Sequence, residues 1–413
     1  MSKVIVIGGG IIGLTSAWYL KKSGFEVTVI DKSDLSDSCS YGNAGMIVPS
    51  HFVPLAAPGM IEKGIRWMFD SKSPFYVKPS LNGELISWGL KFLKSATEDK
   101  VNRAAVPLRN ISLLSKALFL DLQDDLGDFG LQENGILMMY KTAKTENEEV
   151  HLAERARELG LDVEIISGEQ CKQLQPALSL DIKGAVHYKC DAHLYPSQLM
   201  SILIKKLEEA GVVIIRNRAI DKIKITAGSI KAVYSGSEVY VGDEYVLAGG
   251  SWSPEIARMA GLKISLMPGK GYSFMLPEPQ NRIHIPALLC EAKVAVTPMN
   301  GSVRLGGTME IGRINGKINM NRFRGIVEST QQYFPELKPS LPDESSIWFG
   351  FRPCSPDGLP YIGRPASLGN LVIATGHGMM GLSLGPATGK LVSEIISQDK
   401  PSVDIKLYSP NRF

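Results

Sequence analysis

A glycine-rich hexapeptide near the N-terminus constrains the fold of this chain more than any other feature. GGGIIG, at residues 8–13, follows the β-branched run Val4–Ile7 and precedes a helical segment at Thr15–Lys22. A second short β-branched run, Val27–Ile30, comes next. Runs of this kind are typical of strands buried on both faces of a parallel sheet. The pattern predicts a βαβ unit that begins within the first few residues.

The glycines of this hexapeptide have separate places in the predicted turn. Gly8 permits the tight turn, Gly10 lets the backbone approach a pyrophosphate, and Gly13 lets the helix pack closely on the sheet. Asp31 ends the second strand, 18 residues after Gly13, where an acid accepts hydrogen bonds from a ribose. The start of the helix adds free N–H groups and a positive dipole end. The sequence therefore predicts a dinucleotide-binding site.

The composition is that of an ordinary globular protein. The chain has 413 residues, of which 44% are hydrophobic and 21% charged, so it is long enough for two domains. Its net charge is only +3, with acids and bases mixed along the chain. We therefore expect no nucleic-acid partner.

The cysteines and histidines give no sign of a metal site. None of the five cysteines forms a CxxC pair or a metal-ligand spacing with the six histidines, so we expect no metal, and reduced thiols in a cytoplasmic protein. The uncharged run 4–20 superficially resembles a leader, but its glycines are explained by the dinucleotide turn. We expect neither a cleaved leader nor a transmembrane helix.

Further along the chain, segments of two styles alternate. Segments in the α/β style are expected at 197–210 (helix), 212–215 (buried strand), 244–250 (strand), 371–374 (strand) and 380–397 (helix). Between them lie a long helix at 107–128, a strand at 135–141, a helix ending at Gly160, and an antiparallel pattern at 273–276, 294–298 and 303–306.

The alternation predicts an α/β plus α+β protein of two interleaved, discontinuous domains. A Rossmann-like dinucleotide domain would comprise 1–50, 196–260 and 345–413. A substrate domain built on an antiparallel sheet would comprise 51–195 and 261–344, with a helical cover at 59–96. Two amphipathic segments in that cover, Gly59–Phe69 and Gly83–Ala96, interleave aromatic and basic residues. Packing on the core is the favoured interpretation; a peripheral contact with the inner membrane face is the alternative.

Six stretches of the sequence are similar to those of a known protein family. In chain order they are VIVIGGGIIGLTSAWYL, SYGNAGMIVPS, YVLAGGSWS, PGKGYSF, GFRPCSPDGLPYIGR and ATGHGMMGLSLGPATGK. On these stretches the chain resembles the D-amino-acid oxidase superfamily, in particular bacterial D-amino-acid dehydrogenases and the related glycine- and hydroxyproline-oxidising flavoenzymes. The resemblance runs from the first residues almost to the last. It implies non-covalent FAD; a covalent link through Cys354 is the disfavoured alternative.

The resemblance also implies which residues meet the cofactor. The ADP moiety would lie on the glycine turn and on Ile11, Ile12, Asp31 and Lys32. The pyrophosphate and ring would meet Ser40, Asn43, Ala44, Gly45 and Met46, and Ile220 would meet the adenine. Ala248, Gly249 and Trp252 would close over the dinucleotide. The motif Gly376, His377, Gly378, Met379, Met380 and Gly381 is expected to open the last helix and to face the flavin pyrimidine edge.

Three residues are candidates for the chemistry. Arg352 is predicted to hold the substrate carboxylate in two parallel hydrogen bonds; the alternative is a salt bridge to an acid such as Asp357. Tyr272 is a candidate for a second carboxylate contact, or else a core tyrosine. His377 is a candidate base, although the reaction needs only an amine that has already lost its proton.

The predicted function is oxidation of a small amino acid, a D-amino acid or cis-hydroxy-D-proline, by hydride transfer from Cα to flavin N5 in amino-acid catabolism. The electrons would pass to a respiratory-type acceptor, either a quinone or an electron-transfer protein. The alternatives are a glycine- or sarcosine-type oxidase that uses oxygen, an NAD-linked dehydrogenase, and a non-catalytic FAD-binding protein.

Overall fold

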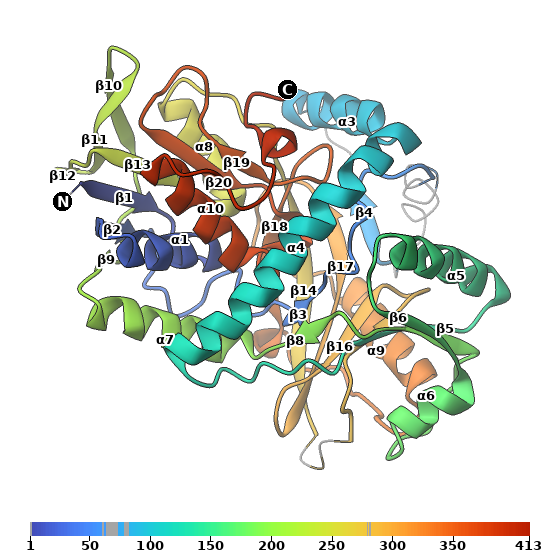
Figure 1. Cartoon of the computed structure of the whole chain (residues 1–413). Coiled ribbons are helices and arrows are strands. Elements are labelled where there is room, and N and C mark those ends of the chain that lie inside the picture. The colour runs from blue at the N-terminus through green and yellow to red at the C-terminus, as the bar shows by residue number, and fades with distance from the viewer. Residues whose placement is uncertain (1, 60–61, 63–72, 78–81, 279, 281) are drawn as a thin grey trace.

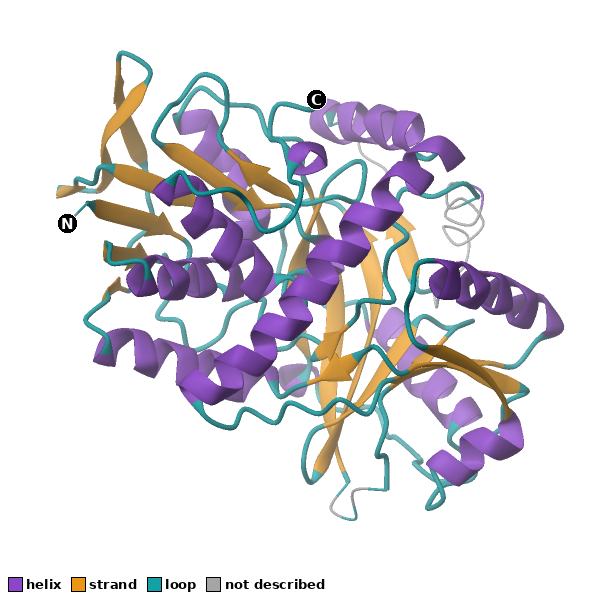
Figure 2. Ribbon diagram, in the orientation of Figure 1, coloured by secondary structure: helices purple, strands orange, loops and turns teal. Residues whose placement is uncertain are grey.

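Two large sheets organise the computed structural model, which describes residues 2–59, 62, 73–77, 82–278, 280 and 282–413. The N-terminus lies beside the first sheet, and the second occupies the lower right of Figure 1. Helix α4 (Glu98–Leu126) runs diagonally across the front of the molecule, beside both sheets. Figure 2 shows that the other helices lie around the outside of this pair of sheets.

The first sheet has six strands among the described residues, in the order β19-β20-β13-β1-β2-β9. All neighbouring pairs are parallel except β19 with β20. The strands are β1 (Lys3–Ile7), β2 (Glu26–Ile30), β9 (Val213–Ile215), β13 (Glu244–Leu247), β19 (Tyr361–Gly363) and β20 (Leu371–Thr375). This is the predicted Rossmann-like α/β sheet.

Alternate residues of each strand pack on opposite faces of this sheet. Val4 and Val6 join a core with α1 (Ile11–Lys22), α7 (Pro196–Glu209), α10 (Gly385–Ser397) and α4. Ile5 and Ile7 point the other way, because successive side chains of a strand alternate. The elements on that second face are α8 (Ser253–Met259) and a small sheet of β10 (Lys222–Thr226), β11 (Ser229–Ser235) and β12 (Glu238–Tyr240).

The second sheet has nine strands among the described residues, in the order β18-β14-β17-β16-β15-β5-β7-β6, with β4 also paired to β17. Most neighbours are antiparallel, as predicted. The strands are β4 (Phe75–Val77), β5 (Ile136–Tyr140), β6 (Val163–Ser167), β7 (Gly184–Tyr188), β14 (Met267–Pro277), β15 (Ala287–Leu289), β16 (Val294–Pro298), β17 (Ser302–Ile311) and β18 (Trp348–Cys354).

Helices cover both faces of the second sheet. One face packs on α9 (Met320–Tyr333) and α6 (Gly168–Leu174). Part of the other face packs on α5 (Ala143–Glu158). The rest of that face is directed toward the first sheet. Strand β3 (Met46–Ile47) pairs with β8 (Ala192–His193) between the two sheets. The domain boundaries stay a proposal; β18 belongs to the segment 345–413 yet pairs with β14 in this second sheet.

The helical cover is described only in part, because most of 59–69 lies outside the described residues. Helix α3 (Gly83–Ser95) packs Trp88 on the second sheet, and the Trp88 indole N–H donates to the Cys354 carbonyl at 2.9 Å. The opposite face of α3 exposes Ile86, Leu90 and Leu93. No helix in the described ranges is long and apolar enough to cross a membrane.

Two expected helix starts and the expected burial of one strand are wrong. Helix α4 begins at Glu98 rather than Pro107, because Thr97 caps it and Glu98 and Asp99 complement the helix dipole. Helix α10 begins at Gly385 rather than at residue 380. Strand β9 is an edge strand and not a buried one, since it pairs only with β2 and Val213 is 53% exposed.

Helices α1 and α10 approach so closely that their backbones touch at Gly389. A Cβ on Gly389 would lie 2.5 Å from the Thr15 carbonyl carbon. We predict that Gly389→Ala lowers the free energy of unfolding by about 1–3 kcal/mol through overpacking. The control is Gly89→Ala in α3, where a Cβ would meet nothing within 4 Å and stability should hold or rise by up to about 1 kcal/mol. Urea denaturation of both variants tests this; equal effects would contradict it.

Candidate cofactor and substrate site

A cavity of about 1260 Å³ lies between the two sheets. Its walls include the ends of β1 and β2, the loop after β13, and the β14, β17 and β18 region of the second sheet. Ligands of open α/β sheets bind at the carboxyl ends of the strands. Because small-molecule sites commonly measure roughly 300–1,000 Å³, this cavity has room for a dinucleotide together with a small substrate.

The glycine turn at one end of the cavity has the predicted backbone geometry. Gly8 has φ +114°, and a Cβ there would lie 2.5 Å from the Ala248 carbonyl oxygen. A Cβ on Gly13 would lie 1.8 Å from the Gly8 carbonyl oxygen, so α1 packs on the turn itself. At Gly10 a Cβ would meet only the Ser40 hydroxyl, at 3.7 Å. The backbone at Gly10 is therefore open to a ligand.

Polar contacts hold this turn in place. The Asp31 carboxylate accepts the Gly9 N–H at 2.6 Å and the Ser33 N–H at 2.8 Å. The Ser40 hydroxyl accepts the Ile11 N–H at 3.0 Å, which ties the loop after β2 to the start of α1. The acid and the small-residue loop singled out in the sequence thus meet at the glycine turn.

Most residues expected to bind the dinucleotide line the cavity. Those that line it are Gly8, Gly10, Ile11, Ile12, Asp31, Lys32, Ser40, Asn43, Ala44, Met46, Ile220, Ala248, Gly249, Trp252, Gly378, Met379, Met380 and Gly381. Gly13, Gly45 and Gly376 lie behind it, where neighbouring atoms leave no space for a side chain. The Lys32 ammonium lies 3.5 Å from the centre of the Trp252 ring, and desolvation lowers the pKa of Lys32.

Residues 377–381 of the last motif line the cavity, but the motif does not open a helix, contrary to expectation. Gly376 and Gly378 have positive φ, and residues 378–380 form a single 3-10 turn before α10 begins. Dipole stabilisation by the N-terminus of a long helix therefore does not apply at this motif.

A short loop, residues 37–45, joins the two sheets beside the cavity. The Arg304 guanidinium on β17 donates to the Tyr41 carbonyl at 2.7 Å and to the Asn43 carbonyl at 2.6 Å. Burial lowers the pKa of Arg304 to about 10, so it stays charged at neutral pH. The Ser273 hydroxyl of β14 donates to the Gly42 carbonyl at 3.0 Å. The second sheet thus fixes a loop expected to contact the cofactor.

Trp348 of β18 packs against the same loop. A Cβ on Gly42 would lie 2.0 Å from the Trp348 ring, so the indole lies flat on this glycine. The indole N–H donates to the Asp37 carboxylate at 2.9 Å. Gly42 is therefore needed to admit Trp348.

Arg352 reaches the cavity from β18 and lies over Gly271 of β14. A Cβ on Gly271 would lie 2.2 Å from Nη1 and 2.4 Å from Cζ of Arg352. Nη1 donates to the Thr308 carbonyl, and desolvation lowers the pKa of Arg352. Within the described part of the chain, no carboxylate forms an ion pair with Arg352. A partly buried cation in this position attracts an anionic ligand.

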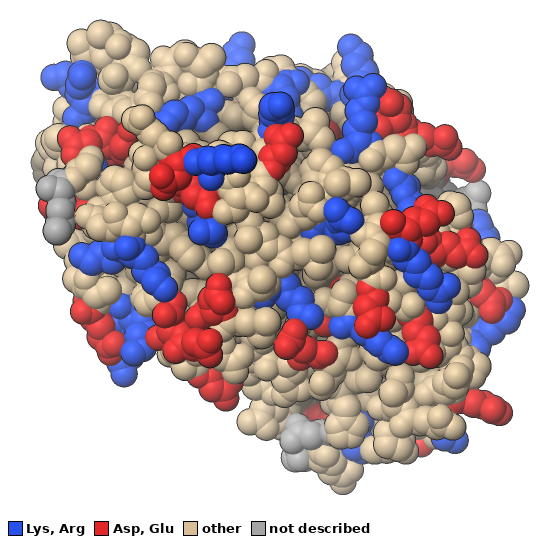
Figure 3. All heavy atoms as spheres, viewed as in Figure 1, with Lys and Arg blue, Asp and Glu red and all other residues tan. Residues whose placement is uncertain are grey.

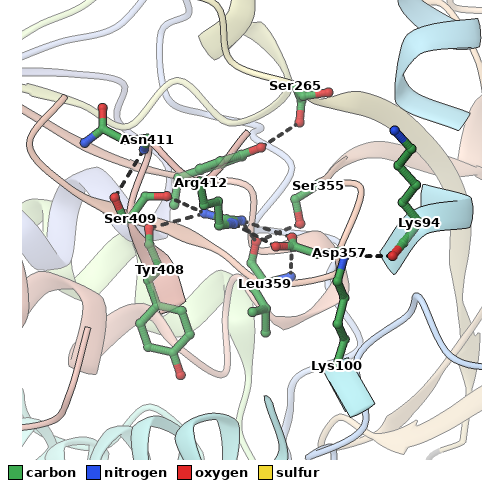
Figure 4. Close-up of polar contacts among 11 residues, drawn as sticks. Lys94, Lys100, Ser265, Ser355, Asp357, Leu359, Tyr408, Ser409, Asn411 and Arg412 are labelled. Atoms are coloured by element: carbon green, nitrogen blue, oxygen red, sulfur yellow. Dashed lines mark hydrogen bonds and ion pairs between the residues drawn. The ribbon is translucent and has the colours of Figure 1, made fainter. Parts of the chain in front are cut away.

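The acid considered as an alternative partner, Asp357, is already paired elsewhere. Figure 4 shows Arg412 pointing at the Asp357 carboxylate, with Nε 2.7 Å from Oδ2 and Nη2 3.1 Å from Oδ1. Arg412 also donates to the Leu359 carbonyl at 2.7 Å. This bidentate pair accounts for Asp357 and leaves Arg352 without it.

Tyr272 contributes to the cavity wall, but its hydroxyl is engaged elsewhere. Its side chain is 1% exposed and packs with Phe274 on the α9 face of the sheet. The hydroxyl donates to Glu310 at 3.1 Å and accepts the Asn319 N–H at 3.2 Å. Because neighbouring residues of a strand alternate in direction, Tyr272 points away from the side on which Arg352 covers Gly271. It is a core tyrosine.

His377 lines the cavity but is a neutral, buried group. Its Nε2 lies 2.9 Å from the Thr388 hydroxyl in the first turn of α10, and burial lowers the pKa of His377 to about 3. Such an imidazole is neutral across the physiological range and is already hydrogen-bonded. It fixes the 376–381 segment to α10.

The thiol of Cys354 is also buried and unreactive. Its side chain is buried, and desolvation raises the pKa of the thiol to about 12. A thiol in that state is a poor nucleophile, which disfavours a covalent link through it.

Several residues of the site escaped the sequence predictions. Thr308 has φ +65°, which is rare for a β-branched residue, and it sits where the β14–β17 register shifts. This backbone turn directs its carbonyl to Arg352. The GGT sequence at 306–308 contained the signal, because glycines within a strand mark bulges or close approaches. Gly271 could have been recognised by the same rule.

The residues present fit a flavin dinucleotide. The cavity is lined at one end by the open backbone of the glycine turn and also by Arg352 on the second sheet, and the fixed 37–45 loop contributes to its wall. The surface visible in Figure 3 mixes basic and acidic side chains and has no continuous basic face. Fold and site together define a protein that binds a dinucleotide, with the Arg352 guanidinium in the same cavity.

The chain belongs to the FAD dependent oxidoreductase family (DAO), whose model matches residues 3–395. Among curated relatives, the D-amino acid dehydrogenase of Helicobacter pylori is 30% identical over 412 residues, covering 98% of each chain. The D-amino acid dehydrogenase of Bradyrhizobium diazoefficiens is 29% identical and covers 100% of this chain and 99% of its own. The protein is an FAD-dependent oxidoreductase.

Solved structures share the fold. Glycine oxidase from Geobacillus kaustophilus superposes with a TM-score of 0.81 at 20% identity, covering 100% of both chains. L-proline dehydrogenase from P. horikoshii gives a TM-score of 0.76 at 22% identity, covering 100% of this chain and 97% of its own. At these identities the likeness concerns the fold alone.

The contact between Gly271 and Arg352 gives a direct test of the anion site. We predict that Gly271→Ala pushes the guanidinium out of place and weakens benzoate binding by about tenfold to a hundredfold, as expected for lost charge-assisted hydrogen bonds. Flavin absorbance, which benzoate would perturb, measures the Kd. The control is Gly316→Ala, whose Cβ would meet nothing within 4 Å. Unchanged affinity in Gly271→Ala would show that Arg352 does not hold the anion.

The low pKa of His377 predicts a pH profile. Since the folded-state value of about 3 lies below the unfolded value of roughly 6.5, the unfolded chain takes up this proton first as the pH falls. His377 therefore costs stability only below about pH 6.5 and carries no charge above it. The rate of flavin reduction in His377→Asn should keep the wild-type pH dependence from pH 6.5 to 9. If the variant lacked an ionisation that the wild type shows in that range, the result would indicate that His377 acts as a base.

Proposed function

We propose that this protein is an FAD-dependent dehydrogenase of small amino acids, with D-amino acids as its substrates and cis-hydroxy-D-proline as the cyclic candidate. The proposal is carried by Arg352, a guanidinium without an acidic partner among the described residues, in the cavity that the dinucleotide turn also lines. The names of the full-length relatives support an amino acid as the substrate.

In this proposal Arg352 binds the substrate carboxylate. Its planar fork matches a carboxylate in two parallel hydrogen bonds. The Thr308 carbonyl occupies one N–H of Nη1, so the remaining donors are left for the substrate. A carboxylate held at both oxygens fixes the position of the attached Cα, and such positioning supplies much of the rate acceleration.

FAD, held by the glycine turn and the 37–45 loop, would supply the oxidant, a hydride acceptor for the substrate Cα–H bond. The amine reacts in its neutral form, and its lone pair forms the C=N bond as the Cα–H bond breaks. Water then adds to the imino acid and releases a keto acid and ammonia, whereas a cyclic amine gives a cyclic imine. None of these steps needs a charged imidazole, which agrees with a neutral His377.

The reduced cofactor would pass its electrons to a quinone or an electron-transfer protein. The dehydrogenase names of the relatives near 30% identity support this acceptor over oxygen. The glycine oxidase likeness bears on the fold and not on the acceptor. Contact of α3 with a membrane surface stays a hypothesis that depends on its exposed Ile86, Leu90 and Leu93.

An anaerobic absorbance titration tests the proposed function. The FAD-loaded protein is mixed with D-amino acids, the L-enantiomers, glycine, sarcosine and cis-hydroxy-D-proline. We expect D-substrates to bleach the flavin band, and Arg352→Ala to lower kcat/KM by at least about a hundredfold. The matched control is Arg324→Ala, at an exposed position of α9. A flavin band that no amino acid bleaches would overturn the proposal.

A further inference from the structure

One corner of the cavity carries polar groups that the proposed chemistry does not use. It is lined by His51, Glu149, Tyr188 and Lys293, and we call these residues the polar corner. The wall around them is apolar and includes Met138, Leu152, Leu288 and Ala295. Burial lowers the pKa of His51 to about 4, so His51 is neutral. The charges of this corner come from Glu149 and Lys293.

Glu149 is a buried acid with an unused oxygen. Its side chain, on α5, is 4% exposed, and Oε2 has no hydrogen-bond partner among the described residues. Burial raises the pKa of this carboxyl. A buried polar atom left unpaired costs about 1–3 kcal/mol, and Glu149 lines the cavity, so a ligand donor that reaches Oε2 would remove this cost.

Lys293 lies on the turn between β15 and β16, in a left-handed conformation with φ +52°. The turn is held by Glu291, whose Oε1 accepts the N–H groups of Lys141 and Thr142, each at 3.0 Å. Both side chains line the cavity, and the Lys293 charge opposes the effect of burial on the pKa of Glu149. No ion pair within 4 Å joins them among the described residues. A polar group of a ligand can therefore bridge the space between them.

The turn that carries Lys293 lies against the same stretch of β17 as the proposed carboxylate anchor. The Lys293 carbonyl oxygen would be 3.4 Å from a Cβ on Gly307. Gly307 directly precedes Thr308, whose carbonyl accepts a hydrogen bond from Arg352. A small amino acid held by Arg352 would thus extend its side chain toward Glu149 and Lys293.

We propose that the polar corner binds the substrate side chain and selects a neutral group that both donates and accepts a hydrogen bond, such as a hydroxyl or a carboxamide. This inference rests on the proposed function. The group would donate to Glu149 and accept from Lys293. A cationic side chain would face the Lys293 ammonium, an anionic one would face Glu149, and an aliphatic one would leave both unsatisfied.

Isosteric substrates test the inference. D-Threonine has a hydroxyl group where D-valine has a methyl group. D-Asparagine has a carboxamide where D-leucine has an isopropyl group. For anaerobic flavin reduction we expect kcat/KM to favour the polar member of each pair by at least about tenfold. Glu149→Met, a change of similar volume, should abolish the preference. The control is Glu148→Met, at the neighbouring exposed position.

Lys293→Met provides a second variant, at an exposed side chain, should Glu149→Met fail to fold; Lys144→Met is its exposed control. Binding without turnover gives a second readout. The Kd of 3-hydroxybutanoate, measured by flavin absorbance, should be about tenfold or more below that of 3-methylbutanoate in the wild type. This difference should vanish in Glu149→Met and Lys293→Met.

The outcomes separate the two proposals. If D-valine and D-leucine bleach the flavin as efficiently as their polar counterparts, the polar corner does not select the side chain, although the enzyme oxidises amino acids. Equal Kd values for the two carboxylates would contradict the inference in the same way. If no amino acid bleaches the flavin, the proposed function fails, and the inference that depends on it fails too.

Discussion

The guanidinium of Arg304 joins the two halves of this protein. It reaches from β17 and donates to the carbonyls of Tyr41 and Asn43, in a loop that starts from the first sheet. Ser273 binds the carbonyl between them. Three backbone carbonyls of the 37–45 loop are thus fixed by side chains of the second sheet. The cavity depends on these contacts, because its wall combines loops of the first sheet with strands of the second.

A second close contact prepares the chemistry. Arg352 can lie flat on β14 only because Gly271 has no side chain, and it is held from behind by a carbonyl of strained Thr308. Strain of this kind costs of order 1–3 kcal/mol and persists where the surrounding structure enforces it. Here the strain at Thr308 helps to orient the Arg352 guanidinium before the substrate binds. The side chain then needs less reorganisation on binding.

The sequence could predict the dinucleotide half of the site because its signals are local. Gly8, Gly13 and Asp31 act within one βαβ unit, and the structure places each at the expected point. The carboxylate side is different, because it depends on the pairing of β14 with β17 and β18, strands distant in sequence. The alternation of side chains along β14 directs Tyr272 into the core. The positive φ of Gly376 and Gly378 interrupts the helix that was expected to begin at residue 380. No local sequence pattern predicts that Glu149 and Lys293 line the cavity.

The most direct test of the account is a crystal structure of the FAD-loaded protein with benzoate. We predict that the dinucleotide runs from the glycine turn along the 37–45 loop, and that the benzoate carboxylate accepts two hydrogen bonds from Arg352 above Gly271. Benzoate bound elsewhere, with Arg352 still directed only at Thr308, would contradict the account of how this cavity positions its substrate.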